Sequence, residues 1–336
     1  MAVVNLVIDM GSSFTTIYKE GEGIVLHEPS VVLVRGNESS YRMVSFGFDA
    51  FNDLPRYTDG KLLSPIQEGA ITYKKATQAM MTKYLSKVVV RSDYFFKPKV
   101  RAFVNIPCGS QREERELVRS VLYSVGIDET YMLEAPQFSA YGSGVQIGAK
   151  PRLFVDIGGG TTDIALLNSD GIEKGASYGI GVTAIDGGIV ESLESSLGVK
   201  IGHAAAEELK KEIGSLFENE NLDKSVVGKN VVSGTAKNVV VTTRHIRTMI
   251  DYYYDKIASV IRSFMKELPD ETLIAVAEEG IIVTGGGAAM RGLDEYLMKK
   301  LKAIVIVPER PEFSCIKGGA NLLAQPRVIN HLLKLS

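Results

Sequence analysis

Two stretches of the sequence follow one pattern and decide the fold: LVIDMGSSFTTI at residues 6–17 and LFVDIGGGTTDI at residues 153–164. Each predicts an apolar strand that ends in an aspartate, a turn rich in glycine or serine, and a second strand of β-branched residues. Glycine permits a tight turn and lets backbone N–H groups approach phosphate oxygens. Two such hairpins facing each other would hold a polyphosphate between two similar halves of the chain.

The aspartates of the two hairpins suggest a cation beside that phosphate. Asp9 and Asp156 end the first strand of each hairpin, where they are placed to hold Mg²⁺ through its water molecules. A dinucleotide-binding glycine pattern would instead open a helix, whereas residues 161–167 alternate like a strand. One Asp-x-Gly turn alone is typical of an ordinary hairpin. A second equivalent copy, and a third glycine run at 284–287 after a predicted strand, favour a nucleotide site.

Composition limits the class of protein. The chain has 336 residues, 45% of them hydrophobic and 23% charged, with a net charge of −2. These values predict a soluble globular protein of about two domains with no nucleic-acid partner. No apolar run reaches the roughly 18–20 residues of a membrane span, and no signal peptide is recognisable. Two lone cysteines, Cys108 and Cys315, suit a reducing compartment, so the predicted location is the cytoplasm.

Hydrophobic periodicity and breakers predict alternating strands and helices in both halves. Strands are expected at 3–8, 15–19, 23–26, 30–34, 100–106 and 280–283, and helices at 72–89, 185–197, 204–216, 245–268 and 317–323. A capping box at Ser110-Gln111-Arg112-Glu113 is expected to open a further helix that Gly126 ends. Residues 41–69 read as irregular and 219–234 as an exposed β-rich insertion. The order of elements predicts an α/β fold with a break near Pro151.

Three segments resemble the nucleotide motifs of the superfamily that contains actin, Hsp70 and the sugar kinases: residues 9–11, 156–163 and 284–287. Within it the sequence resembles MreB, the bacterial actin. The similarity extends to GIVLHEPSVV at 23–32, FKPKV at 96–100, EELKKEIG at 207–214 and VTGGGAAMRGL at 283–293. It implies an actin-like fold of two similar α/β domains with smaller inserted subdomains around a nucleotide cleft. The implied domains are 1–150 plus 316–336, with an insertion at about 33–70, and 151–315, with an insertion at about 184–244.

The resemblance also implies roles for individual residues, with ATP and Mg²⁺ as ligands. Asp9 and Asp156 would lie near Mg²⁺, and Glu207 and Lys210 would contact the ribose or adenine, although their spacing alone suggests a surface ion pair. The residues implied to wrap the phosphates are Gly11, Ser12, Ser13, Phe14, Gly158, Gly159, Gly160 and Thr161. Those implied to line the adenine pocket are Gly285, Gly286 and Gly287.

Two positions depart from the MreB pattern and predict weak ATP hydrolysis. Where the family typically has Glu-Glu-Pro, this chain has Leu133-Glu134-Ala135-Pro136, so Ala135 stands where a glutamate orients the attacking water. Glu134 is one residue away and is expected to point elsewhere unless the backbone adjusts. Lys174 stands where a water-ordering threonine is expected, although a solvated lysine at a strand edge explains it equally. We therefore expect Ala135→Glu and Lys174→Thr to raise the hydrolysis rate.

An aromatic segment suggests contact with a membrane surface. Phe95 and Phe96 precede Lys97-Pro98-Lys99, and the resemblance implies that this loop dips into the membrane. Packing of these rings in the core is the alternative.

The implied function is a cytoskeletal protein that self-assembles into paired protofilaments at the inner face of the cell membrane. Divergence at Ala135 resembles the MreB paralogues of helical wall-less bacteria, whose filaments are linked to helicity and swimming. A sugar kinase or chaperone-like ATPase is the alternative from another class. A plasmid- or organelle-positioning actin would share the fold.

Overall fold

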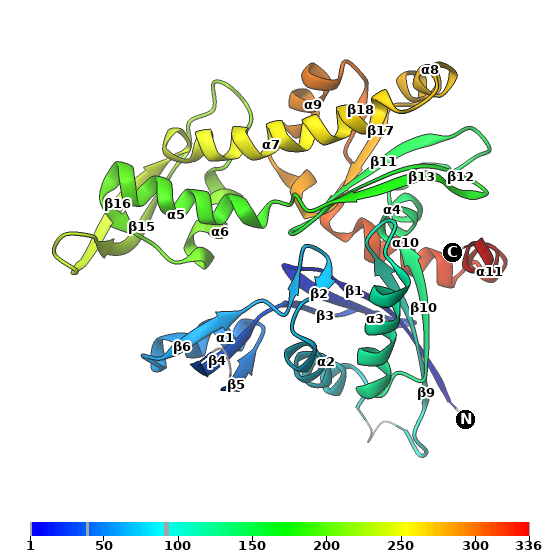
Figure 1. The fold of residues 1–336 in the computed structure, drawn as a ribbon, viewed down its shortest axis with the longest axis horizontal. Coiled ribbons are helices and arrows are strands. Elements are labelled where there is room, and N and C mark those ends of the chain that lie inside the picture. The colour runs from blue at the N-terminus through cyan, green and yellow to red at the C-terminus, as the bar shows by residue number, and fades with distance from the viewer. Residues whose placement is uncertain (1, 38–39, 91–93, 336) are drawn as a thin grey trace.

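The computed structural model describes residues 2–37, 40–90 and 94–335. Across these residues, two five-stranded sheets of equivalent topology organise the fold (Figure 1). The first sheet runs β3-β2-β1-β9-β10 and comprises β1 (Val3–Met10), β2 (Phe14–Lys19), β3 (Gly23–Pro29), β9 (Lys99–Ile106) and β10 (Glu129–Glu134). The second sheet runs β13-β12-β11-β17-β18 and comprises β11 (Arg152–Ile157), β12 (Thr162–Asn168), β13 (Gly171–Tyr178), β17 (Ile281–Thr284) and β18 (Val305–Ile306).

Strand pairing confirms the duplication seen in the sequence. In each sheet three antiparallel strands are extended by two parallel ones. The hairpin turns match as well: Gly11 N–H donates to the Phe14 carbonyl at 3.0 Å, and Gly158 N–H donates to the Thr161 carbonyl at 2.8 Å. The prediction of two α/β halves is therefore confirmed. We call the parts built on the first and second sheets the first half and the second half.

Helices cover the two sheets and form separate cores. The first half carries α2 (Lys74–Val88) and α3 (Arg112–Ser124). The second half carries α5 (Thr183–Leu197), α7 (Thr243–Lys266), α8 (Asp270–Glu279) and α9 (Leu293–Leu301). Helix α7 turns Ile246, Ile250 and Ile257 into the core, in line with the spacing of three and four in its sequence.

Two helices cross between the sheets at glycine residues. Helix α4 (Ala135–Gly142) follows β10, and α10 (Ser314–Leu323) returns the chain to the first half. A Cβ atom on Gly142 would overlap the Ser314 carbonyl, and one on Gly318 would overlap the Phe138 carbonyl. Only glycine lets the two backbones approach this closely. The domain boundaries implied by the resemblance stay a prediction.

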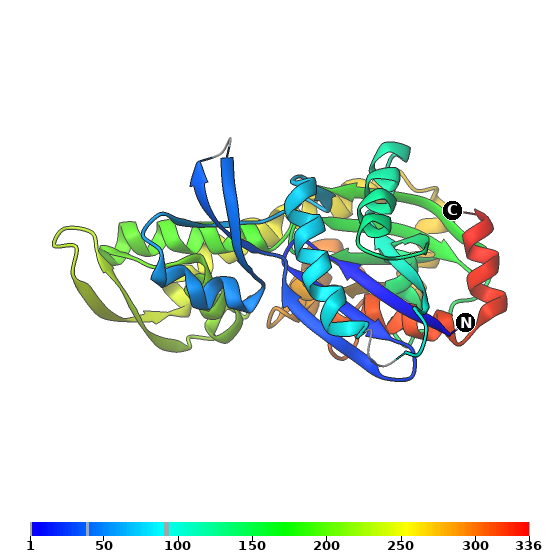
Figure 2. The same ribbon diagram turned by 90° about the horizontal axis from the view of Figure 1, so that it is seen from below.

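Each half carries an insertion, and the two insertions form arms at the end of the molecule away from both chain termini (Figures 1 and 2). The first arm contains β4 (Val32–Asn37), β5 (Ser40–Phe46), α1 (Phe48–Asp53), a 3₁₀ turn (Leu54–Arg56) and β6 (Gly60–Leu63). The second contains β14 (Val199–Lys200), α6 (His203–Ile213), β15 (Asp223–Asn230) and β16 (Ala236–Thr242). The short strands β7 (Ile66–Gln67) and β8 (Ala70–Ile71) follow the first arm.

Three local expectations were wrong. Residues 41–69 are ordered strands and helix rather than irregular chain. The capping box of α3 uses Gln111 and Glu114 instead of Ser110 and Glu113, because the Ser110 hydroxyl donates to the Pro107 carbonyl at 2.6 Å. A further helix, α11 (Pro326–Leu335), follows the predicted last one. Among the residues described, no helix is long and apolar enough to cross a membrane.

Candidate nucleotide-binding site

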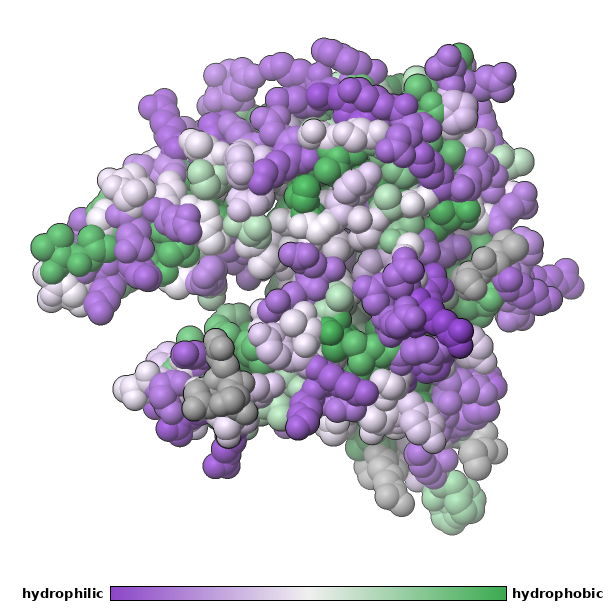
Figure 3. Space-filling model, in the orientation of Figure 1, coloured by the Kyte–Doolittle hydropathy of each residue, from purple (hydrophilic) through white to green (hydrophobic). Residues whose placement is uncertain are grey.

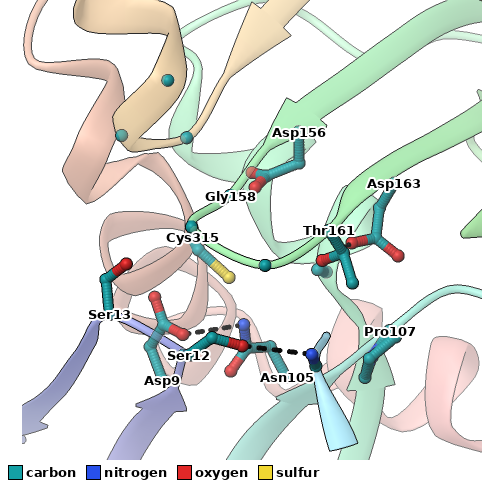
Figure 4. Close-up of a pocket in the computed structure, with 18 of the residues that line it drawn as sticks. Asp9, Ser12, Ser13, Asn105, Pro107, Asp156, Gly158, Thr161, Asp163 and Cys315 are labelled. Atoms are coloured by element: carbon teal, nitrogen blue, oxygen red, sulfur yellow. Dashed lines mark hydrogen bonds between the residues drawn. The ribbon is translucent and has the colours of Figure 1, made fainter. Parts of the chain in front are cut away.

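A cavity of about 1140 Å³ lies between the two sheets, where both glycine-rich hairpins meet. Figure 3 shows the molecule hollowed between the two arms, and Figure 4 shows Asp9, Ser12 and Ser13 facing Asp156 and Thr161 from the other side. The structure brings most of the predicted nucleotide site together here: Asp9, Gly11, Ser12, Ser13, Phe14, Ala135, Asp156, Gly158, Gly159, Gly160, Thr161, Glu207, Lys210, Gly285, Gly286 and Gly287 all line the cavity.

The two hairpin turns fit into each other. The Ser13 and Thr183 hydroxyls lie 2.9 Å apart and share a hydrogen bond between the halves. The Ser12 hydroxyl accepts a hydrogen bond from Gly69 N–H at 3.1 Å. A Cβ atom on Gly159 would overlap the Ser13 hydroxyl, so the serines of one turn occupy the space that the glycines of the other leave open. The backbone of both turns is thereby exposed to the cavity.

The two strand-end aspartates have equivalent partners. Asp9 accepts a hydrogen bond from the Asn105 amide at 3.0 Å, and Asp156 accepts one from the Thr284 hydroxyl at 2.8 Å. Asn105 and Thr284 lie at the ends of β9 and β17, the parallel neighbours of the two hairpins. Asp156 accepts a further hydrogen bond from the Ser139 hydroxyl of α4. Each aspartate is thus held in place at the cavity wall.

Burial places both aspartates in an unfavourable environment for a negative charge. It raises the pKa of Asp9 to about 7; the Asn105 amide opposes this rise and the charge of Asp156 adds to it. Burial also raises the pKa of Asp156, against the effects of its hydroxyl partners. The described residues contain no group of three or more His, Cys, Asp or Glu side chains arranged to hold a metal. Two desolvated carboxylates fit a Mg²⁺ ion that keeps water and phosphate ligands.

Helix α6 presents Glu207 and Lys210 to the cavity, but they do not pair with each other. Lys210 is buried, with its Nζ 2.7 Å from Asp186 Oδ1, and it donates to the Val182 carbonyl at 2.9 Å. Glu207 pairs with Lys211 at 2.6 Å. The surface ion pair suggested by their spacing is therefore wrong, and α6 is anchored to α5 through Lys210.

At the start of α4, Ala135 lines the cavity, whereas Glu134 is not among the residues that line it. The Glu134 carboxylate accepts hydrogen bonds from the Cys108 thiol at 2.8 Å and from Gly109 N–H at 3.1 Å, and it pairs with Arg115 at 3.2 Å. A backbone adjustment would have to bring Glu134 to the attacking water, but its carboxylate is already bonded to the loop between β9 and α3. A methyl group stands where the resemblance expects a carboxylate.

Lys174 does not line the cavity, which corrects its assignment as a water-ordering position. Its Nζ lies 2.8 Å from Glu267 Oε2 and 5.4 Å from the centre of the Phe264 ring, beside α7. Two threonines do line the cavity, Thr16 and Thr161, and the Thr161 hydroxyl donates to Asp163 at 2.8 Å. The positional match that pointed to Lys174 failed because β13 turns that side chain toward α7.

Sequence reasoning missed several residues that hold the site together: Asn105, Ser139, Asp163, Asp186 and Lys211. One signal was available, because Asn105 and Thr284 occupy equivalent places at the ends of the parallel strands of the duplicated sheet. The i, i+4 spacing of Glu207 and Lys211 on α6 was a second signal. Ser139, Asp186 and, across the cleft, Asp163 meet partners from other elements of the chain.

Comparison with known proteins places this geometry in a family. The MreB/Mbl protein family model matches residues 3–331. The cell shape-determining protein MreB of Escherichia coli K12 is 32% identical over 325 residues, which covers 95% of this chain and 93% of the relative. The cell shape-determining protein Mbl of Bacillus subtilis 168 is 28% identical over 320 residues, which covers 94% of each.

Solved structures agree on the fold. MreB5 of Spiroplasma citri bound to ADP superimposes with a TM-score of 0.86 at 24% identity over 98% of both chains. A MamK double helical filament superimposes with a TM-score of 0.77 at 19% identity, over 96% of this chain and 99% of that one. These likenesses show an actin-like fold. Because the family model spans nearly the whole chain and a relative shares 32% of its residues, the chain belongs to the MreB/Mbl family of bacterial actin-like proteins.

Proposed function

We propose that this chain binds ATP with Mg²⁺, polymerises into cytoskeletal filaments and hydrolyses ATP slowly. The observation that carries the proposal is the cavity between the two glycine-rich hairpins, with Asp9 and Asp156 at its wall. Backbone N–H groups in tight turns suit phosphate oxygens, and a cation held at the aspartates would offset the charge of both. A solved relative of the same fold, MreB5 of Spiroplasma citri, is bound to AMPPNP, which supports a nucleotide in this cleft.

The nucleotide would link assembly to the shape of the molecule. Because its phosphates touch both hairpins, binding favours the state in which the halves are closed, a population shift. Filaments assemble from subunits of one shape, so the closed state is the one expected in paired protofilaments. Slow hydrolysis follows from Ala135, since a methyl group neither orients nor deprotonates the attacking water.

A pelleting experiment with microscopy tests this function. Purified protein with ATP and Mg²⁺ is expected to sediment and to form filaments by negative stain, and a fluorescent ATP analogue is expected to bind. Phosphate release is expected to be slow compared with a family member that has glutamate at position 135. Absence of filaments over a range of salt and Mg²⁺ would favour the sugar kinase or chaperone-like alternative.

The cellular role we propose is support of cell shape or helicity, with motility as its most specialised form. The MreB and Mbl relatives are cell shape-determining proteins, which supports shape over the positioning of plasmids or organelles. The MamK filament shows that this fold also occurs in other actin-like filaments. Deletion or depletion in the source organism, scored for both cell shape and swimming, separates these roles.

Contact with the inner face of the cell membrane is part of the proposal. Phe95 and Phe96 are 96% and 73% exposed, so the alternative of core packing is wrong. The segment between α2 and β9 that carries them lies at the lower end of Figure 1, where Figure 3 shows hydrophobic surface. Exposed aromatic rings beside Lys97 and Lys99 suit an anionic membrane surface.

Vesicle sedimentation tests this contact. The Phe95→Ser/Phe96→Ser variant is expected to lose binding to vesicles containing anionic lipid, while filament formation persists. Tyr123→Ser, at another exposed aromatic residue on α3, is the matched control. Equal sedimentation of the double variant and the unmodified protein would remove the membrane role.

A further inference from the structure

The loop between β9 and α3 is held by carboxylates from both halves of the molecule. From the first half, Glu134 accepts Gly109 N–H at 3.1 Å and the Cys108 thiol at 2.8 Å. From the second half, Asp163 accepts the neighbouring Cys108 N–H at 2.7 Å. Cys108 and Asp163 are 5% and 3% exposed, so water does not replace this bond in the closed cleft. Figure 4 shows Asp163 on the second-half side of the cavity and Pro107, at the start of the loop, on the first-half side.

Asp163 also orients the Thr161 hydroxyl of the second hairpin. The Thr161 hydroxyl donates to Asp163 Oδ2 at 2.8 Å, while Cys108 N–H donates to Oδ1. Because the Thr161 proton is committed to Asp163, the lone pairs of its oxygen remain available to accept a hydrogen bond in the cavity. Asp163 replaces the Thr16 found at the equivalent register position of the first hairpin. The duplicated hairpins therefore differ at this register position, and in the second copy the side chain there reaches the opposite half.

We infer that Asp163 is an interdomain latch, whose carboxylate captures Cys108 N–H when the halves close and at the same time fixes the Thr161 hydroxyl. In the open state Asp163 keeps the Thr161 donor and loses the donor from the first half. A hydrogen bond to a charged group is worth about 10- to 100-fold in an equilibrium. The latch therefore slows nucleotide release and ties the orientation of Thr161 to closure. This inference deepens the proposed function and rests on it for its nucleotide readout.

The turn that carries Cys108 permits a sharp test. Ser110 N–H donates to the Pro107 carbonyl at 3.2 Å, and Gly109 has φ +74°, so Cys108 occupies the second position of a β-turn with glycine third. Proline is favoured at that position. Cys108→Pro therefore removes the N–H that Asp163 accepts while suiting the local turn. Cys108→Ala is the matched variant, because it keeps the N–H and removes only the thiol bond to Glu134.

Two rates test the latch, amide exchange at Cys108 and release of a nucleotide analogue. Hydrogen exchange at the Cys108 amide, followed in the nucleotide-free protein and with AMPPNP and Mg²⁺, is expected to be about tenfold faster in Asp163→Asn than in the unmodified protein. Release of a fluorescent ATP analogue is expected to be about tenfold faster in Asp163→Asn and in Cys108→Pro. In Cys108→Ala both rates are expected within about threefold of the unmodified protein. Thr161→Val is expected to change phosphate release without changing exchange at Cys108.

Each other outcome overturns the latch. Unchanged exchange and release in folded Asp163→Asn would show that the hydrogen bond from Cys108 N–H to Asp163 affects neither closure nor nucleotide release. Equal effects of Cys108→Ala and Cys108→Pro would assign the effect to the thiol. Thermal melting establishes that each variant is folded, and Cys108→Pro leaves Asp163 intact if Asp163→Asn does not fold. If the unmodified protein binds no nucleotide, the proposed function fails, yet exchange at Cys108 in the nucleotide-free protein still decides the latch.

Discussion

The two glycine-rich hairpins have the same backbone hydrogen bonds and strand pairing but differ in their side chains. Both have the same turn hydrogen bond, the same pairing with a parallel strand and an aspartate held from that strand. The first hairpin carries Ser12 and Ser13 in its turn, whereas the second carries Gly159 and Gly160. The second also has Asp163 opposite its own Asp156, where the first has Thr16 opposite Asp9. Duplication supplied the phosphate cradle, and divergence made the two copies complementary.

From this difference we expect binding and turnover to be separate properties of the cleft. The hairpins and their aspartates are held mainly by one another and by their parallel strands, with Ser139 of α4 as a further donor to Asp156. The water-positioning side chain would come from α4, which belongs to neither hairpin, and there the chain has Ala135. Losing that residue leaves the cradle intact.

Restoring a carboxylate at position 135 is expected to have the largest effect. Ala135→Glu should raise steady-state phosphate release by about 100-fold, the lower end of the range for general-base catalysis. Ala135→Gln, which matches glutamate in size but is not a base, should give a much smaller increase. Equal rates in both variants would mean that space at α4, rather than a base, limits turnover.

Filling the space between the turns comes next. Gly159→Ala should weaken nucleotide binding by about 10- to 100-fold, because its Cβ overlaps the Ser13 hydroxyl and overpacking costs about 1–3 kcal/mol. Adding Ser13→Gly should restore part of the affinity, and titration with a fluorescent ATP analogue measures both. Gly148→Ala, with no atom within 4 Å of its new Cβ, is the control. No rescue by Ser13→Gly would argue against the interlocking of the turns.

The aspartates predict a pH dependence with a definite sign. The pKa of Asp9 is about 7 in the folded protein, above its ordinary value of 3.8, so between these two pH values the folded state binds more protons than the unfolded state. Without nucleotide, its contribution to stability is full at low pH and is lost as pH rises through 7, by at most about 1.4 kcal/mol per unit. Asp9→Asn should remove this part of the slope in thermal melts between pH 5.5 and 8. Nucleotide with Mg²⁺ should stabilise the unmodified protein more than the variant at pH 8. A slope unchanged in Asp9→Asn would assign it to other buried acids.

Lys174→Thr is expected to have the smallest effect. Its ion pair with Glu267 is largely exposed and lies outside the cavity, so stability should change by less than about 1 kcal/mol. Phosphate release should stay within about twofold, in contrast to Ala135→Glu. A large rise would return Lys174 to the catalytic cleft and contradict its placement beside α7.

Much of the fold followed from local pattern. The paired strand-turn-strand segments could be predicted, because periodicity and glycine turns act within a few residues. So could the long helix, expected at 245–268 and found at 243–266, and the β-rich insertion expected at 219–234, where strands lie at 223–230 and 236–242. The α3 cap shifted by one residue because Ser110 bonds back to Pro107, a turn that the capping pattern does not reveal. Residues 41–69 read as irregular because most of their strands are very short and are interrupted by α1 and a 3₁₀ turn.

The sequence by itself determined the duplicated hairpins, the two strand-end aspartates and the alanine at position 135, where the resemblance implies a glutamate. Tertiary structure decided the partners of the charged side chains: Glu134 with Cys108 and Gly109, Lys210 with Asp186, Lys174 with Glu267, and Asp163 with Cys108 from the opposite half. Strand and turn formation depends on neighbouring residues, whereas a buried charge is stabilised by whichever donors the packing of distant elements brings within hydrogen-bond distance.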